Sequence, residues 1–437
     1  MLNKKSLLII VSIVVLLIAT VAGTYFYVEF FQTDKINDSL LSGNQSANGQ
    51  SSNNNGNQAK DDFVGYKVGD LTYNGSDLVY GGDAPIYVTV YSHNEETWSY
   101  KVNTEIKYRE YRAGLVERAQ VFSDYGIDWD WQTDQPVVDA MIKYEGMADL
   151  LALTDGKNIL QYLESKGASL DPHSHNLNYA DIVYLMKQLG AKASGVIGGT
   201  IVMECGSEYL GFLDFDSWRG NVEIQDDGYV HGEEYPAALW KPTVLSDPGM
   251  GQHWFDDWSS GVWQPGDGSE FLTHDSANEI IYVGEGYPHD TVLIGTEHAG
   301  GSEVYNTDSQ YIKELAEKIA NKELPTGTKG GKRFIYTASI HVRDMAVVDE
   351  DSNPVNTVEG LKKIFAELKP LKDSGKIIFA NFETVAKVWQ TEYNSVPWHI
   401  DLSTFSFYDE TKQQAEDYCA SFEEKTSPKD STRRPRP

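Results

Sequence analysis

The fold class of this chain is indicated most clearly by residues 155–190, DGKNILQYLESKGASLDPHSHNLNYADIVYLMKQLG. The first part has the spacing of an amphipathic helix that stops at Gly167, and ASLDPHSH follows as a strand that runs into a loop. YADIVYLMKQLG is a second helix, ended by Gly190. A strand between two helices is the repeating unit of a parallel sheet covered by helices.

The same alternation continues along the chain. We expect further strands at 85–92, 193–201, 332–341 and 376–382, and further helices at 103–126, 309–324, 357–375 and 383–393. The pattern predicts an α/β fold built on a parallel sheet or a barrel. In such folds the catalytic and ligand-binding residues lie at the carboxyl ends of the strands.

The composition excludes several classes of function. The 437 residues carry a net charge of −29, which disfavours nucleic acid as a partner because phosphate binding needs clustered Lys and Arg. The sequence has no phosphate-binding glycine loop, so it offers no nucleotide site. Its two cysteines, Cys205 and Cys419, are too few for a disulfide framework or a zinc ribbon.

The amino-terminal end predicts the location. In residues 1–31, two lysines precede an uncharged run long enough to span a bilayer, and aromatic residues follow it. We expect a single-pass anchor in the cell membrane with the rest of the chain outside. The alternative is a signal peptide, cleaved after the small residues at 20–22, which gives a secreted protein.

The remaining boundaries follow from composition. Residues 32–60 are rich in Ser, Asn and Gly and predict a flexible linker. Residues 61–84 have short alternating runs and predict a small β extension. The folded part then extends to about residue 422, and the polar segment 423–437 is expected to be a disordered tail.

Two histidines at a strand end form the first candidate site. His173 and His175 are two residues apart in an extended segment, so both imidazoles can face one metal ion. Asn178 and Tyr179 follow them and can add a weak ligand or hold an imidazole in one tautomer. We expect Asn178 to contact substrate as well.

Two carboxylates follow another strand. In YVTVYSHNEETW, a buried strand leads to Glu95 and Glu96. A zinc centre with two histidines and one carboxylate leaves a position for water, and a second carboxylate can take the proton of that water. The alternative reading is a solvated turn.

Two further segments supply candidates. His341 closes the strand RFIYTASIH, where a protonated imidazole can give its proton to a leaving group. The loop 259–276 is rich in aromatic residues and Gly, and Trp263 in it is a candidate for stacking on a sugar, although such rings also occur in cores.

Together these pieces resemble the polysaccharide deacetylase family, the NodB-homology domain. VTVYSHNEE resembles its first motif, with Glu95 and Glu96 where that family has two aspartates. LESKGASLDPHSHNLNY resembles the approach to its histidine motif, and ASIH, with His341, resembles its last motif. VWQPGDG is a weaker match, since Gln264 stands where the family has arginine.

The resemblance implies a distorted (β/α) barrel over residues 85–422, with an insertion at about 205–260. It implies a hydrolase that removes acetyl groups from an extracellular glycan. Glu95, His173 and His175 would bind a divalent metal such as zinc, Glu96 would act as the base, and His341 would act as the acid.

Two other functions remain open. An amidohydrolase or PHP-type metal phosphoesterase also carries Asp-x-His-x-His, as in residues 171–175, but usually on the first strand of its barrel. The other alternative is a surface protein that binds a glycan on a degenerate barrel without cutting it.

Overall fold

The computed structural model describes residues 66–68, 71–94, 102–174, 178–198, 240–246, 259–266, 271–286, 307–342 and 358–402. All of them belong to one compact unit, Phe63–Pro437. The expected anchor (1–31), linker (32–60) and tail (423–437) lie outside the described residues. Within the described ranges, no helix is long and apolar enough to cross a bilayer.

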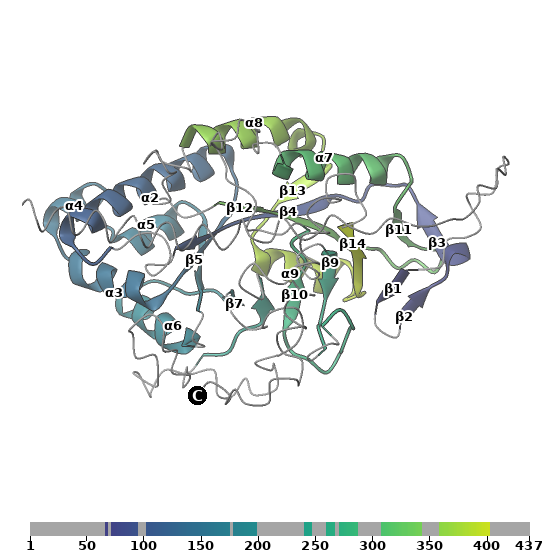
Figure 1. Cartoon of the computed structure of the whole chain (residues 1–437), viewed down its shortest axis with the longest axis horizontal. Coiled ribbons are helices and arrows are strands. Elements are labelled where there is room, and N and C mark those ends of the chain that lie inside the picture. The colour runs from purple at the N-terminus through teal and green to yellow at the C-terminus, as the bar shows by residue number, and fades with distance from the viewer. Residues whose placement is uncertain are drawn as a thin grey trace, which may run out of the picture. The chain divides into compact units, whose positions relative to one another are not determined.

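A parallel sheet in the order β12-β4-β5-β6 carries the ends of the site-bearing strands (Figure 1). β4 pairs with β12 on one side, and with β13 and then β5 on the other. Because the pairs are parallel, the carboxyl ends of these strands meet at one edge. The strands are β4 (Ile86–Asn94), β5 (Trp129–Thr133), β6 (Ala168–Pro172), β12 (Tyr336–His341) and β13 (Ile377–Phe379).

A second, mixed sheet has the order β14-β9-β10-β8-β7. β7, β8 and β10 are parallel, whereas β9 is antiparallel to β10 and β14. The strands are β7 (Val196–Ile197), β8 (Val244–Leu245), β9 (Ser259–Trp263), β10 (Ile281–Val283) and β14 (Trp398–Asp401). β8 therefore belongs to this sheet, although it falls inside the segment expected to be an insertion.

Contacts on both sides link the sheets. His173, after β6, forms an isolated parallel bridge with Gly198, after β7. On the other side, the Ser260 hydroxyl on β9 donates to Thr337 O on β12 at 2.7 Å. The fold is therefore a mixed α/β arrangement with two five-stranded sheets, and among the described strands closure of the expected distorted barrel is not shown.

The amino-terminal part forms short antiparallel pairs. β1 (Tyr66–Val68) pairs with β2 (Leu71–Tyr73). After a short 3-10 helix, β3 (Leu78–Tyr80) pairs with β11 (Pro325–Thr328).

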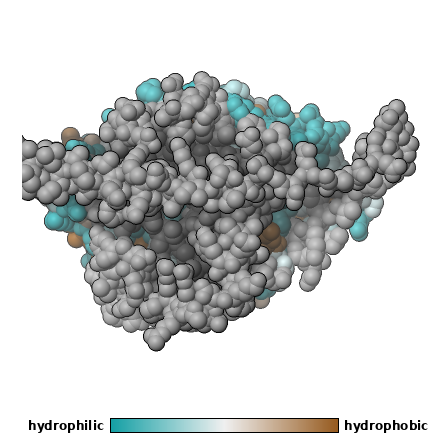
Figure 2. Space-filling view, in the orientation of Figure 1, coloured by the Kyte–Doolittle hydropathy of each residue, from teal (hydrophilic) through white to brown (hydrophobic). Residues whose placement is uncertain are grey.

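Helices cover the outer face of the parallel sheet. They are α2 (Glu105–Tyr125), α3 (Gln135–Tyr144), α4 (Ala148–Ala152), α5 (Ile159–Ser165), α6 (Tyr179–Gln188), α7 (Thr307–Ala320) and α8 (Val358–Asp373). α2 packs against α3, α5 and α8, and α7 packs against α8. Figure 2 shows hydrophilic residues along the upper edge of the view, where Figure 1 places α7 and α8.

The alternation of β4 separates two environments, since successive side chains of a strand point to opposite faces. Three apolar side chains join the core beneath the outer helices: Ile86, Val88 and Val90. Tyr87 and Tyr91 face the other way, into a second cluster that includes strands of the mixed sheet. The inner face of β4 thus lies between the two sheets.

α9 (Phe382–Glu392) fills part of this inner space. Its first turn is capped by Asn381, whose side chain accepts a hydrogen bond from Thr384 N at 2.8 Å. Phe382 and Trp389 are buried against the inner face of β4 and the strands of the mixed sheet. The helix itself was expected from its apolar spacing, but its position inside the fold was not.

Most expected elements are confirmed, among them α2, α5, α6, α7 and α8 and the strands β4, β6 and β12. β5 and α3 were not expected. α3 begins after Asp134, whose carboxylate accepts from Val137 N at 3.1 Å, and Pro136 lies in its first turn.

Candidate active site

Three histidines gather at the carboxyl edge of the parallel sheet. His93 lies near the end of β4, His341 ends β12, and His173 directly follows β6. The ring centroids of His93 and His173 are 4.1 Å apart, and those of His93 and His341 are 4.7 Å apart. His173 is 1% exposed and His341 is 6% exposed. We call these three side chains the histidine cluster.

The cluster continues into a buried tyrosine and glutamate. The Tyr91 ring stacks on His341, with centroids 4.9 Å apart and an interplanar angle of 27°. Its hydroxyl donates to Glu285 Oε2 at 2.8 Å. Glu285 follows β10 and is fully buried, so both sheets supply polar groups to the same place.

A buried amide contacts the cluster from β5. His173 Nδ1 lies 3.3 Å from Gln132 Oε1, and Gln132 Nε2 donates to Ser246 Oγ at 2.6 Å. Gln132 and Ser246 are both fully buried. A histidine in a folded core is commonly held by such a partner, which orients its ring.

Two buried aspartates lie near this site: Asp130 on β5, two residues before Gln132, and Asp171 on β6, two residues before His173. Burial raises the pKa of Asp130 well above its ordinary value, and the neighbouring Asp171 adds to this effect. Burial also raises the pKa of Asp171 to about 7, against hydrogen bonds from Ser194 and Ser169 at 2.6 and 2.7 Å. Near neutral pH, this pair therefore holds a proton that separate exposed aspartates would have lost.

Asn178 stabilises the segment that follows His173. The Ser174 hydroxyl donates to Asn178 Oδ1, and Asn178 Nδ2 donates to Gln135 Oε1 at 2.7 Å. The Tyr179 hydroxyl donates to Ser174 O at 2.9 Å. Asn178 is 2% exposed, so in this structure its polar atoms serve the protein, and contact with substrate stays a prediction.

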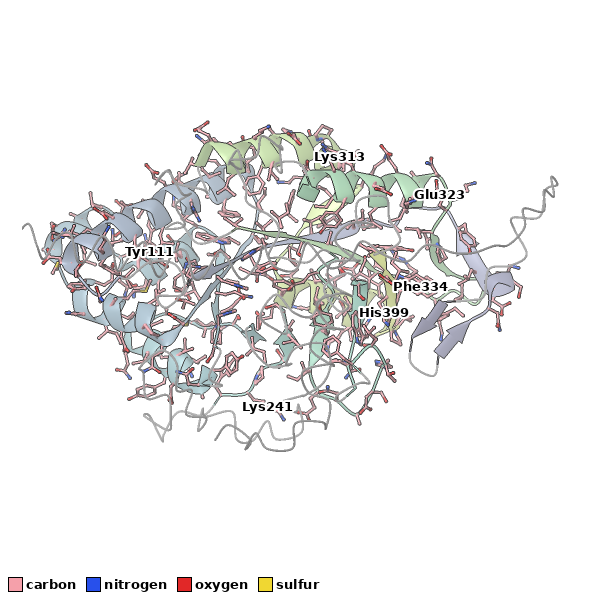
Figure 3. All side chains as sticks on the ribbon, in the orientation of Figure 1. Tyr111, Lys241, Lys313, Glu323, Phe334 and His399 are labelled. Carbon is pink, nitrogen blue, oxygen red and sulfur yellow. The ribbon has the colours of Figure 1, made fainter. Side chains whose placement is uncertain are left out.

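Tyr111 supports the neighbouring strand end. Its hydroxyl, on α2 and labelled in Figure 3, donates to Asn94 Oδ1 at 3.1 Å. Asn94 Nδ2 in turn donates to Gln132 O at 3.0 Å. This network joins the ends of β4 and β5 directly beside His93.

Trp263 is a core residue in this structure. Its ring is fully buried, its Nε1 donates to Phe271 O at 2.8 Å, and it packs edge-on against Tyr282 with centroids 4.7 Å apart. A ring in this position has no exposed face on which a sugar could stack. The placement does not support the glycan-stacking role predicted for it.

The other predicted site residues, Glu95, Glu96 and His175, lie outside the described residues. The described histidines supply imidazole nitrogens, which suit zinc in kind. In the described part of the chain, however, no group of three or more His, Cys, Asp or Glu side chains is placed to hold a metal ion. The described residues alone therefore do not make a complete metal site.

Several members of the site are not predicted from the sequence. His93 stands two residues before Glu95, the first of the two predicted carboxylates, and Gln132 alternates with tryptophans in WDWQT. Glu285 follows the short apolar run IIYV. The signal common to all three is a polar residue at or just beyond the end of a short buried strand.

Comparisons with known proteins give a loose likeness. No family model matches the sequence, and no curated protein matches it. A candidate polysaccharide deacetylase from Mycobacterium smegmatis is similar at 8% identity and TM-score 0.35, over 74% of this chain and 95% of that one. A candidate glycoside hydrolase/deacetylase from Parabacteroides distasonis is similar at 10% identity and TM-score 0.36, over 72% and 73%. A GH57 branching enzyme from Thermococcus kodakaraensis has 12% identity and TM-score 0.31, over 71% of each chain.

Proposed function

We propose that this protein is a hydrolase that removes acetyl groups from a polysaccharide or cell-surface glycan. One observation carries the proposal: His173 and His341, singled out separately in the sequence, are buried and belong to one cluster with the half-buried His93. Burying polar rings is unfavourable unless hydrogen bonds replace their contacts with water. A cluster of three histidines therefore indicates a functional site more than a role in core packing. The carboxyl edge of a parallel sheet is the usual place for one.

Acid–base groups of the cluster suit hydrolysis. An imidazole can release a proton near neutral pH, so His341 is assigned as the acid that protonates the departing amine or alcohol. Tyr91 supports this ring by stacking and is itself held by Glu285. Glu96 is assigned as the base that takes the proton of the attacking water.

The proposal includes a divalent metal, with zinc as the ion that imidazole ligands favour. Glu95, His173 and His175 are its proposed ligands. When bound, such an ion polarises the acyl carbonyl. The proposal also places the protein at the cell membrane through residues 1–31, with the catalytic part outside the cell.

Acetate release tests the proposal. The full chain is incubated with chitin oligosaccharides and with O-acetylated xylan, and free acetate is measured for the wild type and His173→Ala. Acetate release by the wild type and its loss in the variant support the proposal, whereas equal release by both would remove His173 from the mechanism.

The alternatives give different results in the same experiment. Hydrolysis of phosphate esters without acetate release would indicate a metal phosphoesterase. Glycan capture that persists when His173 and His175 are both replaced, without acetate release, would indicate a non-catalytic binding protein.

A further inference from the structure

The Gln132 side chain lies between His173 and Ser246, and the three side chains come from different strand ends. All three are almost completely buried. In such a site the hydrogen positions follow from which atoms can donate and which can only accept. The series of contacts therefore determines which nitrogen of His173 carries its hydrogen.

Ser246 sets the direction of the series. Its hydroxyl donates to Ile197 O at 3.1 Å and so uses its single hydrogen. Toward Gln132 it can only accept, and the Gln132 amide nitrogen accordingly lies 2.6 Å from Ser246 Oγ. The other end of the amide, Oε1, must then face His173.

An amide oxygen has no hydrogen to give, so the nitrogen opposite Gln132 Oε1 must be the donor. That nitrogen is Nδ1 of His173, at 3.3 Å. We propose that Gln132 and Ser246 are positioning residues that hold neutral His173 with its hydrogen on Nδ1. Nε2 is then the nitrogen with the lone pair, ready to take a proton or bind a metal.

Gly198 makes room for this contact. A Cβ at this position would overlap Gln132 Oε1 and would lie 3.0 Å from His173 Nδ1. The Gly198 carbonyl also accepts from Ser174 N at 3.2 Å, which holds the backbone beside His173. Glycine is thus required by close approach, and Gly198→Ala pushes the amide away from the ring without removing a polar group.

The tautomer of His173 can be measured by ¹⁵N NMR on the full chain, labelled at histidine and treated with a chelator. At a pH above roughly 8, an ordinary imidazole is neutral and its two nitrogens give distinct shifts. His173→Gln identifies the signal of His173. The wild type is expected to show the Nδ1–H form.

Two changes are expected to introduce the Nε2–H form. Gln132→Leu removes the amide, and Ser246→Ala removes the acceptor of Gln132 Nε2, so that the amide can rotate and turn its nitrogen toward His173. Ser260→Ala is the matched control, because Ser260 is an equally buried serine whose hydroxyl donates to backbone, Thr337 O at 2.7 Å. It should leave the His173 signal unchanged. Gly198→Ala gives a second route to the Nε2–H form if Gln132→Leu does not fold.

An Nε2–H form in the wild type would overturn the inference, and so would an unchanged Nδ1–H form in both Gln132→Leu and Gly198→Ala. The consequence for catalysis rests on the proposed function: Ser246→Ala should lower kcat/KM for acetate release by about 10- to 100-fold. The two claims fail separately. A wild type with the Nδ1–H form but no acetate release contradicts only the proposed function, and an active enzyme with the Nε2–H form contradicts only this inference.

Discussion

The rings of His93 and His173 lie 4.1 Å apart, although β5 separates their two strands in the sheet. Strands on either side of a third are about 9.6 Å apart, twice the ordinary spacing. The two rings must therefore lean toward each other across the carboxyl end of β5, where Gln132 contacts His173. The site depends on β5 as much as on the strands that carry the histidines.

Metal binding is expected to depend on the segment after β6. The wild-type chain should retain about one equivalent of a divalent metal per chain after dialysis. The double variant His173→Ala/His175→Ala should lose it, because two of the proposed ligands are gone. Elemental analysis of the dialysed proteins measures this, with His399→Gln as a control histidine outside the cluster. A double variant that holds as much metal as the wild type would contradict the ligand assignment.

A buried ion pair is expected to matter for stability. Arg112 on α2 pairs with Glu145 at 2.7 Å with both side chains buried, and Glu145 Oε2 also accepts from Ile159 N at 2.7 Å. Glu145→Gln should lower the free energy of unfolding by about 3–5 kcal/mol, because it leaves a buried guanidinium without its counter-charge.

The same helix provides the control. Arg109 pairs with Glu105 at 2.8 Å, but both side chains are partly exposed to solvent. Glu105→Gln should change the free energy of unfolding by less than about 1 kcal/mol. Urea unfolding of the two variants measures the difference, and equal losses would show that burial does not decide the strength of these pairs.

Stability is expected to fall as the pH rises toward neutrality. The folded-state pKa of Asp130 is raised, chiefly by burial, and that of Asp171 is raised to about 7. In the unfolded chain both carboxyls titrate near pH 4. Between these values the folded state binds more protons than the unfolded state, so its stability is greatest at the acid end and is lost as the pH rises through the folded-state pKa.

Asp130→Asn tests this dependence by removing one carboxyl of the pair. The slope of unfolding free energy against pH, measured by urea unfolding between about pH 4.5 and 7.5, should become shallower. Asp373→Asn, on the exposed end of α8, should keep the wild-type slope. A wild-type slope in Asp130→Asn would argue against the buried pair as its source.

The frame of the fold could be predicted where local pattern and environment agree. β4 is β-branched and aromatic from Ile86 to Tyr91 because both of its faces are covered, and such a run indicates a buried strand. β5 was not predicted, because its local pattern and its environment disagree. Asp130 and Gln132 look like solvent-facing residues in WDWQT, yet both are fully buried and face the site.

The site was predictable only in part because alternation identifies a face but not its neighbours. His173 and His341 stood out as polar residues at strand ends, while their contact with His93 depends on the order of strands in the sheet. The apolar spacing of α9 likewise predicted a helix with one buried face. It did not show that this face packs between the two sheets, beneath the cluster.

Acetate release from chitin oligosaccharides and O-acetylated xylan, compared between the wild type and His341→Gln, shows whether the histidine cluster is a hydrolytic site. We expect the wild type to release acetate and His341→Gln to lower kcat by about 10²- to 10⁴-fold, the usual contribution of a positioned acid. We expect His399→Gln to remain active. A His341→Gln variant as fast as the wild type would contradict the assignment of the histidine cluster as a hydrolytic site.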